Sequence, residues 1–124
     1  MAKLFIFLGS IMGFLSVALG AFGAHGLRDR VTEKLLMNWN TGAQYHMYHA
    51  IAMVLVGILA MKLANSAQLN WAGWSFFVGI LLFSGSLYAM ALTGITKLGA
   101  ITPLGGLAFL IGWALVAIAA LRGA

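Results

Sequence analysis

The chain has 124 residues, of which 63% are hydrophobic and 7% are charged. Soluble domains carry about 25% charged residues, so this composition excludes a surface made for water and indicates a surrounding of lipid. The net charge of +5 comes from cations scattered singly between apolar runs, which argues against nucleic-acid binding, and the absence of cysteine excludes disulfides, thiolate metal sites and cysteine nucleophiles.

Charged residues divide the chain into four uncharged stretches, at about 4–24, 43–61, 71–92 and 103–121. Each has about 20 residues, which at 1.5 Å per residue crosses a hydrocarbon core of about 30 Å. Because lipid offers backbone amides no partner, each stretch is predicted to be a helix. The sequence therefore predicts an all-α, four-span transmembrane helical bundle. It forms a single integral-membrane domain over residues 1–124.

The first stretch also has features of a signal peptide, with Lys3 as the charged start and small residues at 21, 23 and 24. Its apolar run is longer than the roughly 7–15 residues of the apolar region of a signal peptide, so a retained helix is the better interpretation.

Small residues recur along this first stretch in steps of four and three, which lets a neighbouring membrane helix approach closely. Whether that neighbour belongs to the same chain or to another copy stays open. These residues are Gly9, Gly13, Ser16, Gly20 and Gly23.

The connector over 25–42 is the most charged part of the chain. Apolar residues at helical spacing within Val31–Trp39 predict a short amphipathic helix lying in the membrane interface, with Trp39 at headgroup level. An ordered loop is the alternative. The fold prediction therefore includes a short interfacial amphipathic segment between spans 1 and 2.

The third and fourth stretches carry further polar and small residues. Ser84 and Tyr88 are four residues apart and share a helix face, where hydroxyl groups bond to their own backbone or to another helix. Gly105 and Gly112 lie on a second face of small residues, predicted to pack against a helix. Trp113 is interpreted as core packing, with a pocket wall as the alternative.

The densest titratable run, 44–49, reads Gln-Tyr-His-Met-Tyr-His at the start of the second stretch. We expect His25, His46 and His49 to gather at one interface. Four interpretations compete: ordinary interfacial residues, an interhelical hydrogen-bond network, a small-molecule or proton site, and a zinc or copper site of three imidazoles. The metal site lacks a carboxylate in any span to orient the imidazoles. No catalytic residue is predicted because no nucleophile–base pair stands out, and no cofactor is expected.

Four motifs occur together in this order: residues 20–27, residues 44–50, residues 83–88 and residues 102–106. Over essentially the whole chain they resemble the domain-of-unknown-function 423 family. These are small bacterial inner-membrane proteins related to the transmembrane protein 256 group. The resemblance implies four spans, no established activity, and termini in the cytoplasm. His46 departs from the family pattern, where glutamine is more frequent, which weakens the three-histidine metal site. Typical positions of the family include His25, Tyr45, His49, Ser84 and Tyr88.

Two functional hypotheses follow. The first is a structural or partner-binding membrane protein that packs through its small-residue faces, as a homo-oligomer or with another membrane protein. The second is a carrier or sensor for a small molecule, an ion or a proton, with a polar lining near one membrane interface. That lining would comprise His25, Tyr45, His49, Ser84 and Tyr88. A metal-dependent enzyme ranks third, and an enzymatic role is not favoured. We expect the protein in the cell membrane, with both termini on the same, cytoplasmic side.

Overall fold

The structure is a computed structural model that describes residues 1–63 and 67–122, and this part of the chain contains helices and no strand. Four helical rods are long and apolar enough to cross a membrane, which confirms the predicted four-span, all-α fold. The elements in chain order are α1 (Ala2–Phe22), the π-helical η1 (Gly23–Leu27), α2 (Glu33–Lys62), α3 (Ala67–Gly79), the π-helical η2 (Ile80–Ser84), α4 (Gly85–Thr93), the 3-10 helix η3 (Thr96–Ala100) and α5 (Thr102–Arg122).

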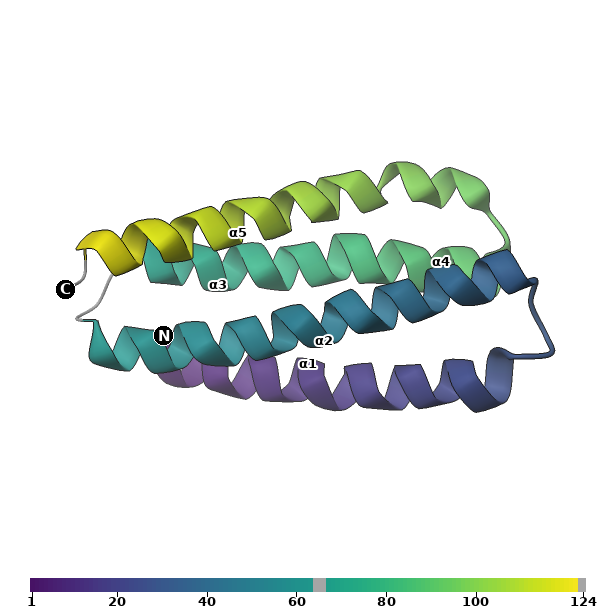
Figure 1. The fold of residues 1–124 in the computed structure, drawn as a ribbon, viewed down its shortest axis with the longest axis horizontal. Helices are drawn as coiled ribbons and strands as arrows, with labels where there is room; N and C mark the ends of the chain where they lie inside the picture. The colour runs from purple at the N-terminus through teal and green to yellow at the C-terminus, as the bar shows by residue number, and fades with distance from the viewer. Residues whose placement is uncertain (64–66, 123–124) are drawn as a thin grey trace.

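The four rods run alternately up and down, and α1 begins at the end of the bundle where α5 finishes (Figure 1). The second rod, α2, and the third rod, α3–η2–α4, occupy the middle, with the first and last rods on either side (Figure 1). In the most apolar window of each rod, 39% and 44% of the residues are buried in the two middle rods, against 17% and 22% in the outer two. The outer rods therefore present most of their surface to lipid.

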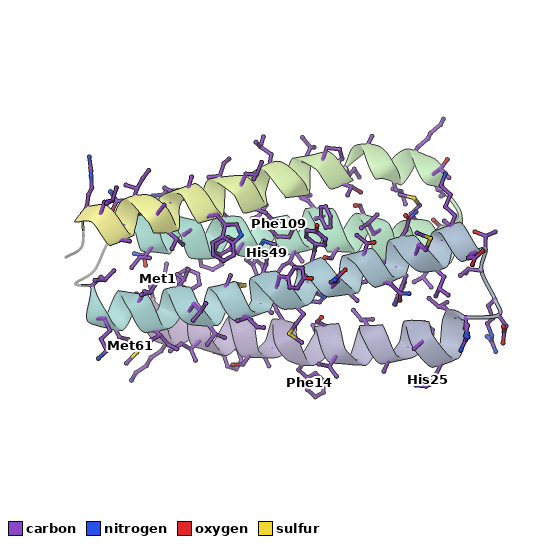
Figure 2. All side chains as sticks on the ribbon, in the orientation of Figure 1. Met1, Phe14, His25, His49, Met61 and Phe109 are labelled. Carbon is purple, nitrogen blue, oxygen red and sulfur yellow. The ribbon has the colours of Figure 1, made fainter. Side chains whose placement is uncertain are left out.

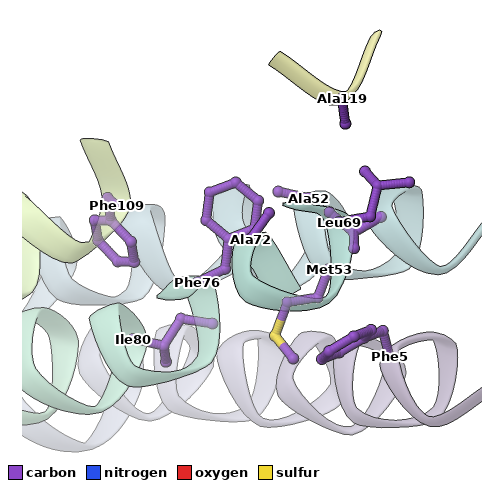
Figure 3. Packing of buried hydrophobic residues seen from close by; sticks show 10 residues of the cluster. Phe5, Ala52, Met53, Leu69, Ala72, Phe76, Ile80, Phe109 and Ala119 are labelled. Atoms are coloured by element: carbon purple, nitrogen blue, oxygen red, sulfur yellow. The ribbon is translucent and has the colours of Figure 1, made fainter. Parts of the chain in front are cut away.

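The larger hydrophobic core lies where α1, α2, α3 and α5 meet (Figure 3). Phe5, Phe76 and Met53 are its largest fully buried side chains. Lipid tails are as apolar as these side chains, so close van der Waals packing holds the rods together instead of exclusion from water.

Several of the small residues lie where two helices approach closely within this chain. A Cβ atom added at Gly9 would lie 2.7 Å from Val54 Cγ2 of α2, and one added at Gly105 would run into the backbone nitrogen of Phe83. These two positions exclude any side chain unless a helix moves. Of the remaining predicted packing glycines, Gly13 and Gly20 would place a Cβ at an ordinary distance of 3.9 Å from the Cβ atoms of Ala50 and Ala43. A Cβ at Gly112 would lie 2.5 Å from the Phe76 ring.

The separate interfacial helix expected over Val31–Trp39 is not formed. Instead α2 begins at Glu33, and the Oγ1 of its N-cap residue Thr32 accepts a hydrogen bond of 3.2 Å from the Leu35 amide. The helix then continues without a break to Lys62, so only residues 28–32 separate the first two rods. The reason is that capping, and not the loss of hydrophobicity, sets where this helix begins.

The Trp39 side chain is buried in the bundle and does not face outward as an interfacial anchor would. The indole N–H donates to the carbonyl of Leu19 on α1 at 2.7 Å, and the ring packs against Tyr88 with centroids 4.6 Å apart. The absence of a side chain at Gly23 leaves the room that the indole occupies. Tryptophan combines a large apolar body with one donor, and here both are satisfied by neighbouring helices.

Candidate functional site

The polar run 44–49 lies within α2, and its members divide between the inside and the outside of the bundle. His46 and His49 are buried, whereas Tyr45 and Tyr48 remain 39% and 49% exposed. The two histidines are three residues apart, and each turns toward a different neighbouring rod. The run therefore contributes to two separate regions of the molecule.

His46 belongs to a set of hydrogen bonds between α2 and the third rod. Its Nδ1 lies 2.9 Å from the Tyr88 hydroxyl of α4, and Ser84 Oγ of η2 donates to the Gly42 carbonyl at 2.6 Å. We call Gly42, His46, Ser84 and Tyr88 the polar link. Within the described residues, His46 Nε2 is buried and has no hydrogen-bond partner. The polar link thus joins α2 to the third rod through buried hydrogen bonds, and it leaves one buried nitrogen, His46 Nε2, unsatisfied.

His49 faces α5 on the other side and uses both ring nitrogens. Trp113 Nε1 donates to His49 Nε2 at 3.1 Å, and His49 Nδ1 lies 2.8 Å from the Tyr45 carbonyl. An indole can only donate and a carbonyl can only accept. These partners therefore define a neutral imidazole that carries its proton on Nδ1. The ring stacks on Phe109, with centroids 3.5 Å apart and planes inclined by 5°.

A groove of about 400 Å³ opens beside His49, between α2, η2 and α5. His49 and Phe109 lie between the ribbons of α2 and α5 in Figure 2. No charged side chain lines this groove, and most of the lining side chains are aromatic. We call it the aromatic groove. Its lining residues are Tyr45, Tyr48, His49, Phe83, Gly106, Phe109, Leu110 and Trp113.

The π-helical segment η2 forms one wall of the aromatic groove. The amide of Gly85 bonds to the carbonyl of Ile80, five residues earlier, which is the widened turn of a π-helix. Phe83 lies on this turn, where its backbone meets Gly105 and its ring lines the groove. Turns of this kind are frequent at functional sites. No pattern in the sequence pointed to this one.

The predicted cluster of three histidines is not assembled. His25 is exposed in η1 at one end of the bundle, whereas His49 lies well inside it (Figure 2). His46 and His49 are bonded to different helices, through Tyr88 and Trp113. Over residues 1–63 and 67–122, no group of three His, Cys, Asp or Glu side chains is placed to hold a metal ion.

The remaining predicted site residues separate in the same way. Tyr45 and His49 line the aromatic groove, and Ser84 and Tyr88 belong to the polar link. The contribution of α5 was largely missed from sequence, because Gly106, Phe109 and Leu110 are apolar members of an apolar span. The one available signal was Trp113, for which a pocket wall was the alternative interpretation.

A second hollow, of about 470 Å³, lies at the end of the bundle where α2 begins and α4 ends. It contains one cationic side chain, Lys34, which is exposed. The Asn38 side-chain amide contacts Met90 Sδ across it at 3.5 Å. None of the site residues predicted from the sequence lines this hollow.

Comparison with known proteins places the chain among membrane proteins. A family model described as "Protein of unknown function (DUF423)" matches residues 19–106. The UPF0382 membrane protein YwdK of Bacillus subtilis (strain 168) is 53% identical over 120 residues, covering 97% of this chain and 98% of the relative. A UPF0382 membrane protein of Staphylococcus epidermidis is 46% identical over 120 residues, covering 97% of both chains.

No solved structure matches the chain. The family match and the relatives agree with the four membrane-spanning rods and with the resemblance seen in the sequence. The chain is therefore a multi-pass integral membrane protein, and it belongs to the DUF423 family of proteins of unknown function.

Proposed function

We propose that this protein binds a lipophilic small molecule, which enters the aromatic groove sideways from the bilayer, and acts as a membrane-embedded carrier or sensor of that molecule. The observation that carries the proposal is the aromatic groove itself, a hollow that joins the predicted residues Tyr45 and His49 to α5. A volume of about 400 Å³ lies within the range of about 300–1,000 Å³ typical of small-molecule sites.

The lining supports this kind of ligand. Binding pockets are mostly apolar and aromatic, with a few polar groups that fix the orientation of the ligand. The aromatic groove has this composition, and two of its lining residues, Tyr45 and Tyr48, carry a hydroxyl group. Its outer residues Leu110 and Trp113 are 68% and 45% exposed. On the flank of a membrane-spanning helix such a surface meets lipid, so the bilayer is the route of entry.

The polar link supports a different role for the other predicted residues. Ser84 and Tyr88 spend their hydroxyl groups on hydrogen bonds to α2, so we assign them to the assembly of the bundle. His25 lies outside both regions and has no part in the proposal.

The test uses a neutral photoactivatable probe, a phenyl diazirine with an alkyl tail, added to the protein in lipid nanodiscs. Mass spectrometry of the irradiated protein then locates the labelled residues. We expect preferential labelling of the groove tyrosines and Trp113 over other lipid-facing residues. Labelling spread evenly over the lipid-facing surface of the four rods would contradict the proposal.

A matched pair of variants sharpens this test. A Cβ added at Gly106 would lie 3.9 Å from Phe83 Cδ2, an ordinary contact, and Gly106 lines the groove, so we expect the side chain of Gly106→Leu to occupy it. At Gly85 a Cβ would meet nothing within 4 Å, so Gly85→Leu makes the same change outside the groove. We expect Gly106→Leu to abolish groove labelling and Gly85→Leu to preserve it.

Three finer predictions about the whole protein stay proposals. We propose that the chain is one integral-membrane domain, that it associates with further copies or with another membrane protein, and that its termini face the cytoplasm. Labelling of Lys3→Cys by a membrane-impermeant reagent should occur in opened cells and not in intact ones. Cross-linking in native membranes, with masses read on gels, tests the association.

A further inference from the structure

We infer that the ligand of the aromatic groove is a neutral, flat ring bearing carbonyl oxygens, of the quinone type, with an alkyl tail that extends into the lipid. This inference rests on the proposed function and names the chemical class of its ligand. It follows from three properties of the lining: the flat aromatic walls, the hydrogen-bonding groups that remain free, and the absence of charge.

The walls of the groove suit a planar ring. His49 of α2 stacks on Phe109 of α5, and both rings line the groove. Phe83 packs between Tyr45 and Phe109, with centroids 4.9 Å and 5.4 Å away, so the aromatic lining is continuous from α2 to α5. Aromatic groups associate through offset or edge-to-face contacts at such separations. A flat ring gains these contacts, whereas a flexible alkyl chain gains only dispersion.

The hydrogen-bonding groups of the groove are unevenly used. Both nitrogens of His49 have partners, and the indole N–H of Trp113 is spent on one of them. The two phenols remain. Gln44 Nε2 donates to the Tyr48 oxygen at 2.7 Å, which leaves the phenolic proton of Tyr48 free to be donated. No hydrogen bond from the Tyr45 hydroxyl to another described residue is present.

The free hydrogen-bonding groups of the groove are therefore donors, and a ligand that bonds to them must carry acceptors. A phenol gives one O–H donor, and carbonyl oxygens are acceptors of matching kind. Tyr45 and Tyr48 both line the groove, with ring centroids 5.5 Å apart, and two phenols at this spacing match a ring that carries carbonyl oxygens at its edge.

The absence of charged residues from the lining of the groove argues against charged amphiphiles as ligands. None of its lining residues is Lys, Arg, Asp or Glu. A fatty-acid carboxylate or a lipid phosphate placed there would be a charge without a partner in an apolar surrounding, which is strongly unfavourable. Sterols and alcohols bring a hydroxyl group but lack the flat, unsaturated ring. A neutral quinone meets all three conditions.

The experiment measures how well two competitors suppress groove labelling by the phenyl diazirine probe in nanodiscs. The first is a methyl-naphthoquinone with a short prenyl tail, and the second is the methyl-naphthalene with the same tail and no carbonyl groups. We expect the quinone to compete about twentyfold better, the effect of two ordinary hydrogen bonds. Tyr45→Phe and Tyr48→Phe should each weaken quinone competition by about fivefold and leave naphthalene competition unchanged.

The outcomes separate the inference from the proposed function. Equal competition by the two compounds overturns the quinone class while the groove remains a binding site for apolar rings. A quinone preference that survives both tyrosine variants also overturns the inference, because the donors then lie elsewhere. No groove labelling in the unchanged protein overturns the inference together with the proposed function. Tyr88→Phe is the matched control, since Tyr88 lies in the polar link and outside the groove.

Discussion

His46 and His49 occupy the same helix, one turn apart, and they show how differently the two sides of α2 are built. On the His46 side, α4 comes close: a Cβ added at Gly42 would lie 3.2 Å from the Tyr88 ring and 3.3 Å from Leu87 Cβ. On the His49 side, α5 leaves a hollow of about 400 Å³. The first side is closed by hydrogen bonds between helices, and the second is open to lipid.

This difference between the two sides of α2 depends on which glycines of α5 lie in contact with η2 and which do not. Gly105 and Gly106 are neighbours on α5, yet only Gly105 touches the backbone of η2. Gly106 faces the aromatic groove, with room for a side chain. One step along the helix therefore separates a position in close contact with another helix from a position that faces the groove. A stripe of small residues seen in a sequence does not distinguish these two roles.

The largest effect should come from breaking the contact of α5 with η2. In Gly105→Ala the new methyl group collides with backbone atoms of Phe83, which cannot rotate away, so we expect a loss of about 2–3 kcal/mol in the free energy of unfolding. Gly106→Ala makes the same change where there is space and should alter stability by less than about 1 kcal/mol. Denaturation by SDS titration in mixed micelles measures both. Similar losses for the two variants would contradict the assigned roles.

A smaller effect is expected from removing the Tyr88 hydroxyl. Tyr88→Phe keeps the ring that packs on Trp39 and leaves both nitrogens of His46 without a bond from the polar link. We expect a loss of about 1–2 kcal/mol from the unsatisfied buried group. In a His46→Leu background the same substitution should cost less than half as much, because the partner is already gone. Equal costs in the two backgrounds would show that the pair is not coupled.

The smallest effect should follow from removing the Ser84 hydroxyl. Ser84→Ala deletes the bond to the Gly42 carbonyl, but that carbonyl keeps its partner within α2, so we expect a loss of about 0.6 kcal/mol. Ser10→Ala is the control, because Ser10 bonds to Ile6 of its own helix and is exposed. Its loss should be near zero in the same titration. If Ser10→Ala lowers the free energy of unfolding as much as Ser84→Ala does, the Ser84 hydroxyl does not stabilise the contact between the two helices.

Much of the architecture was predictable because lipid imposes it. Four apolar stretches of about 20 residues have no stable form in a bilayer other than helices, and the structure contains four such rods. The boundaries were less predictable. Residues 33–42 are too polar to be predicted as part of a span. They nevertheless form the first turns of α2, because Thr32 caps the helix and Trp39 packs inside the bundle.

The candidate site was predictable only in part. The run 44–49 identified Tyr45 and His49, which line the groove. The hypothesis of a polar lining placed Ser84 and Tyr88 beside them, whereas both bond to α2 in the polar link, as the alternative of an interhelical hydrogen-bond network allowed. His25 was placed with the other histidines because it closes the first stretch near the start of the second. Sequence proximity to an interface does not fix the direction in which a side chain points.

By itself the sequence determined the class of protein and the number of spans, because hydropathy and helical length are local properties. Only the tertiary structure decided which polar groups are satisfied and which face an open groove. The deciding contacts join residues 42 positions apart, as for His46 and Tyr88, and 64 positions apart, as for His49 and Trp113. Such pairs depend on how closely whole helices approach, and no local pattern specifies that distance.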